Sequence, residues 1–266
     1  MFAPFMLHAW IVATLVAISA GSVGFFVVAR RASFAAHALP LGAFPGAAAA
    51  SLLGVNELWG LAGFAVLGVL VLDQLQRVGR REVASALWLT GALALGMLLL
   101  SLSGRYAQSV YSLLFGNLLG IDAAQVAVVG GCSAVMLALL AVIARPLLLD
   151  SLSCDLAAAA GARPSVLELL FLGILGIAAA IAVPVVGALL VFSLMVGPGS
   201  AARAFTHQPW SALALTVGIS LVVIWSAIAL AYVSNWPVGF FVGVAGILCY
   251  VVGRWRGGAA ALAHSL

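Results

Sequence analysis

His37 is the side chain whose type and position most directly suggest chemistry in this chain of 266 residues. It lies in the stretch 30–46, RRASFAAHALPLGAFPG, where two arginines close one apolar run and prolines and glycines interrupt the start of the next. Polar residues inside apolar segments are costly, so they tend to mark a pathway or a site. Two interpretations are open. His37 marks a pathway or a site, where its imidazole could be a pH-sensitive group, or it is a solvated side chain at a membrane surface.

The segment 148–163 carries the second candidate motif. Asp155, Ala157 and Gly161 form the pattern D-x-A-x3-G, which Arg163 and Pro164 follow. A short helix of small residues that ends at a glycine is suited to docking in a groove of another protein. The alternative is an ordinary helix in a loop.

Other kinds of chemistry find little support. The chain contains no lysine, so it cannot form the Gly-Lys-Ser/Thr end of a P-loop. We find no Ser/His/Asp or Cys/His arrangement with a spacing suited to nucleophilic catalysis, and no basic, aromatic-interleaved face for nucleic acid. The three cysteines are far apart and are read as small hydrophobes or loop residues. We expect this chain to be no enzyme and to bind no nucleic acid.

The remaining titratable residues are read more simply. We interpret His8, His207 and His264 as interfacial or solvated side chains. Glu168 is expected to stabilise the N-terminus of a helix through its negative charge. For Glu57 and Asp122, two roles are open: they receive a cation on the outer side, or they solvate loops.

The composition of the chain indicates which kind of secondary structure must position these residues. The chain is 65% hydrophobic and 7% charged, with a mean hydropathy of +1.27, whereas soluble domains carry about 25% charged residues. The apolar runs are continuous and lack the period-two alternation of a membrane barrel. We therefore predict an all-α, polytopic integral membrane protein with about eight or nine transmembrane helices, forming a single transmembrane domain over residues 1–266.

The apolar runs predict nine spans, at about 5–29, 38–54, 59–72, 85–103, 124–144, two within 166–202 that meet near Pro184 and Gly187, 211–232 and 238–253. Residues 105–122 are more polar, and we expect a short interfacial or re-entrant helix there. With strict alternation, ten of the eleven arginines fall on one face, and Arg105 is the exception. Cytoplasmic loops are enriched in arginine, so this face and the C-terminus are predicted to be cytoplasmic.

Several motifs, in the same order, resemble the membrane permease subunit of zinc/manganese-type (metal ion) ABC importers. Beyond the D-x-A-x3-G motif, which is similar to the family's coupling helix, these are the segments 22–37, 111–122 (YSLLFGNLLGID), 186–206 and 234–243 (SNWPVGFFVG). Segment 186–206 is similar to the family's "vGtlLvsalLviPaatAr" stretch, with Gly187 and Pro198 in place. The resemblance covers nearly the whole chain and implies that Gly187 and Pro198 lie on a pathway or gate helix.

The resemblance also implies a metal pathway. The family's second span begins with a D-x-x-x-H pattern, whose two side chains share one helix face and can coordinate a divalent ion. Here the two positions are His37 and Leu41, so one potential metal ligand remains and the other is replaced by an apolar side chain.

The implied function is that of a permease moving zinc or manganese across the bacterial cytoplasmic (inner) membrane as a multi-pass protein. The implied partners are a cytoplasmic ATPase that binds ATP and docks at about 148–163, an extracytoplasmic substrate-binding protein and a second permease copy. No cofactor is expected on this chain itself. Two alternatives remain: an ATP-independent secondary transporter or channel, and a degenerate family member with a different substrate.

Overall fold

A computed structural model describes residues 4–78, 80–103, 115–116, 118–159, 161–206 and 208–263. Over these residues the chain is helical apart from short turns, and it contains nine segments long and apolar enough to cross a membrane. The predicted all-α, polytopic architecture is confirmed, including the count of spans at the upper end of the predicted range.

The described helices, in chain order, are α1 (Pro4–Ala29), α2 (Ser33–Gly42), α3 (Phe44–Leu53), α4 (Glu57–Val78), α5 (Arg81–Ser103), the 3-10 turn η1 (Leu118–Gly120), α7 (Ala123–Leu152), α8 (Cys154–Ala159), α9 (Pro164–Val186), α10 (Ala188–Phe205), α11 (Pro209–Ser234) and α12 (Val238–Ala263).

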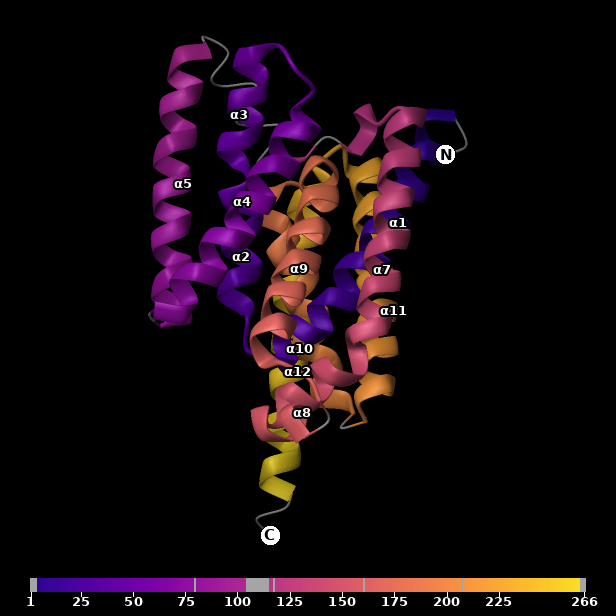
Figure 1. Cartoon of the computed structure of the whole chain (residues 1–266). Coiled ribbons are helices and arrows are strands. Elements are labelled where there is room, and N and C mark those ends of the chain that lie inside the picture. The colour runs from indigo at the N-terminus through magenta and orange to yellow at the C-terminus, as the bar shows by residue number, and fades with distance from the viewer. Residues whose placement is uncertain are drawn as a thin grey trace.

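The helices form one elongated bundle (Figure 1). Helices α1, α2 and α9 have the largest shares of buried residues, whereas α5, α7 and α12 have the smallest. Helices α3, α4 and α5 pack together on one side, and α10 packs extensively on α12 and α1. The short helix α8 lies at the end of the bundle where the C-terminus emerges, and the N-terminus lies toward the opposite end (Figure 1).

The second span is broken in the middle. It begins at Ser33, earlier than the predicted start at 38, and divides into α2 and α3 at Ala43. Pro45 stands in the first turn of α3, where its missing N–H costs nothing, and Pro40 lies within the last turn of α2. The interruption is one residue long: Ala43 keeps right-handed helical dihedrals (φ −81°, ψ −14°), and Ser33–Leu53 remains one candidate span.

The long apolar run 166–202 divides as the sequence predicts. Helix α9 ends at Val186, and Gly187 adopts φ 93°, ψ 145° before α10 begins at Ala188. This left-handed φ favours glycine, so Gly187 separates two spans that composition alone would merge.

The predictions for the fifth span and for the segment 105–122 need comment. Helix α7 continues to Leu152, beyond the predicted end of that span at 144. Most of the expected re-entrant segment 105–122 lies outside the described residues. Within its described part, Gly116 has φ 76° and approaches the break between α9 and α10, since a Cβ there would lie 2.5 Å from the Val185 carbonyl oxygen.

Candidate functional site

His37 lies on α2 and faces α10. Its ring is half-buried and meets the ring of Phe192 edge-on, with 5.1 Å between the centroids. The Nδ1 atom is buried and has no hydrogen-bond partner in the described structure. The fold therefore brings His37 against α10, which contains Pro198 and begins directly after Gly187. The family resemblance predicts that all three residues lie on a pathway.

Leu41, one helical turn after His37, is almost completely buried at 5% exposure. Within the described ranges, no group of three His, Cys, Asp or Glu side chains lies close enough together to hold a metal ion. At this position the described residues thus offer the His37 imidazole alone rather than a ligand set. A cation passing here would keep most of its coordination shell from water or from other groups.

Helix α10 packs closely against α1, the helix that precedes α2 and His37. Gly24 of α1 lies so near the backbone of Met195 that a Cβ at Gly24 would overlap its carbonyl oxygen, and a Cβ at Gly199 would lie 2.9 Å from the Gly24 carbonyl oxygen. Small residues allow such close approach of helices in lipid. Pro198 lies in α10 between Met195 and Gly199. It is buried and lacks the N–H that would bond the carbonyl one turn earlier.

The predicted coupling segment 148–163 contains the last turn of α7, which ends at Leu152, and the short helix α8. The Asp155 N–H donates to Ser153 Oγ at 3.2 Å, which starts the helix. At its end, the Gly161 N–H bonds to Ala158 O and the Ala162 N–H to Ala157 O. This is the Schellman pattern, and Gly161 supplies the left-handed residue it requires with φ 80°.

The three motif residues of the coupling segment face different surroundings. Asp155 and Gly161 are exposed, whereas Ala157 is completely buried and belongs to the hydrophobic core. A partner bound at α8 would therefore reach Asp155 and Gly161, while Ala157 allows the helix to pack closely on the bundle.

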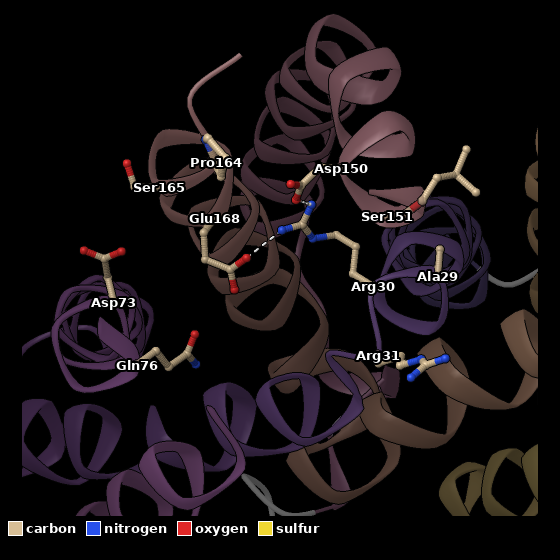
Figure 2. A pocket seen from close by; sticks show the side chains of 11 residues that line it. Ala29, Arg30, Arg31, Asp73, Gln76, Asp150, Ser151, Pro164, Ser165 and Glu168 are labelled. Carbon is tan, nitrogen blue, oxygen red and sulfur yellow. Dashed lines mark hydrogen bonds and ion pairs between the residues drawn. The ribbon is translucent and has the colours of Figure 1, made fainter. Parts of the chain in front are cut away.

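A charged cluster lies beside this segment and was not anticipated. Arg30, directly after α1, reaches Asp150 through Nη1 and Glu168 through Nη2, both at 2.5 Å (Figure 2). All three side chains are largely buried, and the guanidinium carbon lies 5.1 Å from the centre of the Phe171 ring. Three helix ends, those of α1, α7 and α9, thus meet at one arginine.

Backbone geometry explains why Arg30 turns inward and Arg31 does not. The Ala32 N–H bonds to Val27 O and the Arg31 N–H to Val28 O, so α1 ends in a second Schellman motif. Arg31 occupies its left-handed position with φ 56°, although it is not glycine. Arg31 is exposed and points away from the Arg30 cluster (Figure 2).

A polar cavity of about 440 Å³ borders the Arg30 cluster. Asp73 and Gln76 of α4 stand on its far side, opposite Arg30, Asp150 and Glu168 (Figure 2). From the sequence, Arg30 is expected to be an orientation signal and Glu168 an electrostatic partner of its own helix. The ion pairs join residues 120 and 138 positions apart, and no local pattern signals them.

Other predicted residues have plainer positions. Asp122 caps α7: its carboxylate accepts the Gln125 N–H at 2.7 Å, and Gln125 Oε1 accepts the Asp122 N–H at 3.3 Å. The sequence D-x-x-Q is itself a capping-box signature that could have indicated this role. Glu57 is exposed in the first turn of α4, and His8 is partly exposed on α1. His207 and His264 lie outside the described residues.

Comparison with known proteins relates this geometry to a family. The family model "ABC 3 transport family" matches residues 2–257, a range that includes every candidate span. The chain belongs to the ABC 3 transport family. It is accordingly a multi-pass membrane permease of the ATP-binding cassette class, as the motif order in the sequence predicts.

Named relatives and a solved structure agree with this assignment. The manganese import system permease protein ScaB of Streptococcus parasanguinis is 25% identical over 237 residues, which cover 88% of this chain and 84% of ScaB. ScaB of Streptococcus pneumoniae is 27% identical over 242 residues, with the same coverage. The structure of PsaBC from Streptococcus pneumoniae in complex with Fab superposes with a TM-score of 0.84 at 22% identity, covering 95% of this chain and 91% of that chain. This likeness supports the fold.

Proposed function

We propose that this chain is the permease subunit of a bacterial importer that moves a divalent transition metal, manganese or zinc, across the cytoplasmic membrane. The observation that carries the proposal is the family match over residues 2–257. Relatives that are named manganese import permeases and align over 88% of the chain favour a metal substrate, and manganese over zinc.

The proposed assembly follows from the same reasoning. Two copies of this chain would line a shared path, and a separate cytoplasmic ATPase would bind ATP and dock on α8. An extracytoplasmic binding protein would deliver the substrate. The position of α8 at one end of the bundle, with Asp155 and Gly161 exposed, supports such docking. This chain would carry no ATP site and no resident cofactor, and its role would be to change conformation.

His37 would act on the substrate in transit. Its imidazole lies on α2 against Phe192 of α10, in the first half of the second span, and would give the ion one weak, exchangeable ligand. Weak ligation favours release, so selection would rest mainly on the binding protein. ATP binding in the partner would switch the path between outward-facing and inward-facing states.

Transport by the purified assembly tests this proposal. The chain is extracted in detergent with the ATPase that co-purifies with it, reconstituted in liposomes with the binding protein, and supplied with radioactive manganese or zinc. We expect ATP-dependent uptake of at least one metal. Uptake without ATP would favour the secondary-transporter alternative, and ATP hydrolysis that neither metal stimulates would favour a different substrate.

Two variants examine the pathway assignment in the same system. We expect His37→Ala to lower metal uptake about tenfold, as the loss of one group acting on a metal ion does. Leu41→His restores the second ligand position of the family pattern and should strengthen metal stimulation of ATP hydrolysis. If both variants behave as the unaltered protein does, His37 and Leu41 lie away from the path of the ion.

A further inference from the structure

The Arg30 cluster joins the two helices that flank α8 to the helix that leads into the candidate pathway. Asp150 lies in the last turn of α7 and Glu168 near the start of α9, so the two carboxylates stand on either side of α8. Arg30 closes α1, and only two residues separate it from α2, which carries His37. The two ion pairs therefore bridge the segment that a partner would move and the segment that would guide the substrate.

We propose that Arg30 is a positioning residue that transmits movement of α8 to α1 and α2 through its two ion pairs. The inference rests on the proposed function, because it assumes that an ATPase docks on α8. In this arrangement a displacement of α8 shifts the adjoining ends of α7 and α9 together. The guanidinium, held by both carboxylates, carries the turn between α1 and α2 with them.

The chemistry of the three groups suits this task. A guanidinium is planar and presents separate N–H groups to separate acceptors, whereas an ammonium is a single point charge. Nη1 and Nη2 each serve one carboxylate, so Arg30 fixes the positions of Asp150 and Glu168 relative to each other. The pairs are largely shielded from water, so solvent screens them less than it would screen surface pairs.

The charge distribution also indicates that the cluster specifies one arrangement of these helix ends, beyond any contribution to stability. Asp150 stands at a helix C-terminus, where the helix dipole disfavours a negative charge, and Arg30 compensates it. Buried ion pairs are weak evidence for net stability, and they are best attested as devices that specify one arrangement. The cavity of about 440 Å³ beside the cluster leaves room for these groups to shift without repacking the core.

A second contact holds the end of α1 as well. Arg203, in the last turn of α10, donates from Nη1 to the Val28 carbonyl at 3.2 Å. The end of α1 is thus attached to α7 and α9 by Arg30 and to α10 by Arg203. Among these contacts, only the two ion pairs of Arg30 connect the end of α1 to the helices on both sides of α8, namely α7 and α9.

The test measures movement directly and uses the complete complex with its ATPase. Phe34 in the first turn of α2 and Leu156 on α8 are both exposed, and each is replaced in a separate sample by a spin-labelled cysteine after Cys132, Cys154 and Cys249 are changed to alanine. Distances between the labels of the two permease copies are compared before and after trapping with ATP and vanadate. We expect both label positions to shift in the otherwise unaltered complex.

In the variant Arg30→Met, movement of α8 should no longer be accompanied by movement of α2. The label at position 156 should still shift on ATP trapping, whereas the shift at position 34 should be lost. The ratio of substrate transported to ATP hydrolysed should fall by about twofold to thirtyfold, the usual range for changes in coupling energy. Arg30→Lys keeps the positive charge but lacks the two separate nitrogen donors of the guanidinium. It should therefore retain part of the shift at position 34.

Arg31→Gln is the matched control, since it removes the same charge from the neighbouring residue, which points away from the cluster. It should behave as the unaltered complex does. The proposal is overturned if the label at position 34 moves normally in Arg30→Met, or if it does not move in the unaltered complex. It is also overturned if neither Arg30 variant assembles, because Arg30 would then serve folding. Normal label movement without metal uptake would reject the proposed substrate alone.

Discussion

Gly46 of α3 and Gly60 of α4 meet backbone to backbone. A Cβ atom placed on either residue would overlap the carbonyl oxygen of the other. Such contacts let two helices approach closely in a membrane, where association depends on packing. This contact attaches the second half of the broken span to α4.

Alanine at this crossing should therefore force the two helices apart. We expect Gly46→Ala and Gly60→Ala each to lower the stability of the purified protein by about 1–3 kcal/mol, measured as the melting temperature in detergent. Gly63→Ala on the same helix is the control, because a Cβ at Gly63 has no neighbour within 4 Å in the described structure. Equal effects at Gly60 and Gly63 would contradict the close crossing.

Arg31 carries a local conformational cost at the end of α1. Its φ of 56° lies in the left-handed region, which costs a residue with a side chain about 1–2 kcal/mol and costs glycine little. Arg31→Gly should accordingly be about 1 kcal/mol more stable than Arg31→Ala, although both remove the same charge. Thermal unfolding of the two variants side by side makes the comparison, and indistinguishable melting temperatures would speak against the Schellman turn.

Asp122 should act as a helix cap and not as a cation-binding group. Asp122→Ala removes the acceptor of the Gln125 N–H and should cost about 1 kcal/mol, with faster hydrogen exchange in the first turn of α7. Asp122→Asn keeps an acceptor without the charge and should retain most of the protection. If Asn were as damaging as Ala, the charge itself would be the functional property.

Changes on the exposed face of α8 should uncouple transport without preventing membrane insertion. Gly161→Val places a β-branched side chain at φ 80°, which strains the turn, and Asp155→Trp adds bulk at an exposed position. Both should reduce ATPase co-purification and uptake while the protein still reaches the membrane. Gly161→Asn, which tolerates the left-handed region, is the control. Undiminished ATPase binding and uptake in Gly161→Val and Asp155→Trp would remove the docking role.

Local patterns in the sequence were sufficient for the spans and for several of their ends. The break at Gly187 follows from a proline and a glycine inside a run too long for one span. The end of α8 at Gly161 was likewise predictable, because glycine most readily adopts the left-handed conformation that terminates a helix. The cap at Asp122 had a recognisable signal that the sequence analysis did not use.

The candidate pathway was predictable only in part. The family resemblance singled out His37, Gly187 and Pro198, but the sequence did not indicate that Phe192 would meet the His37 ring. It also did not indicate that Ala157 would be buried while Asp155 and Gly161 stayed exposed. Both facts depend on how each helix is rotated about its axis, and small, uniformly apolar side chains do not specify that rotation.

Composition by itself determined that this is an all-helical membrane protein, and the placement of the arginines predicts one arginine-rich face. A chain this apolar must satisfy its backbone polar groups within helices, and positive charge remains on the cytoplasmic side. Only the tertiary structure decided that Arg30 turns inward to Asp150 and Glu168 while Arg31 does not. The physical reason is that a buried charge needs a partner, and the helix packing determines which distant helix ends lie close enough to supply one.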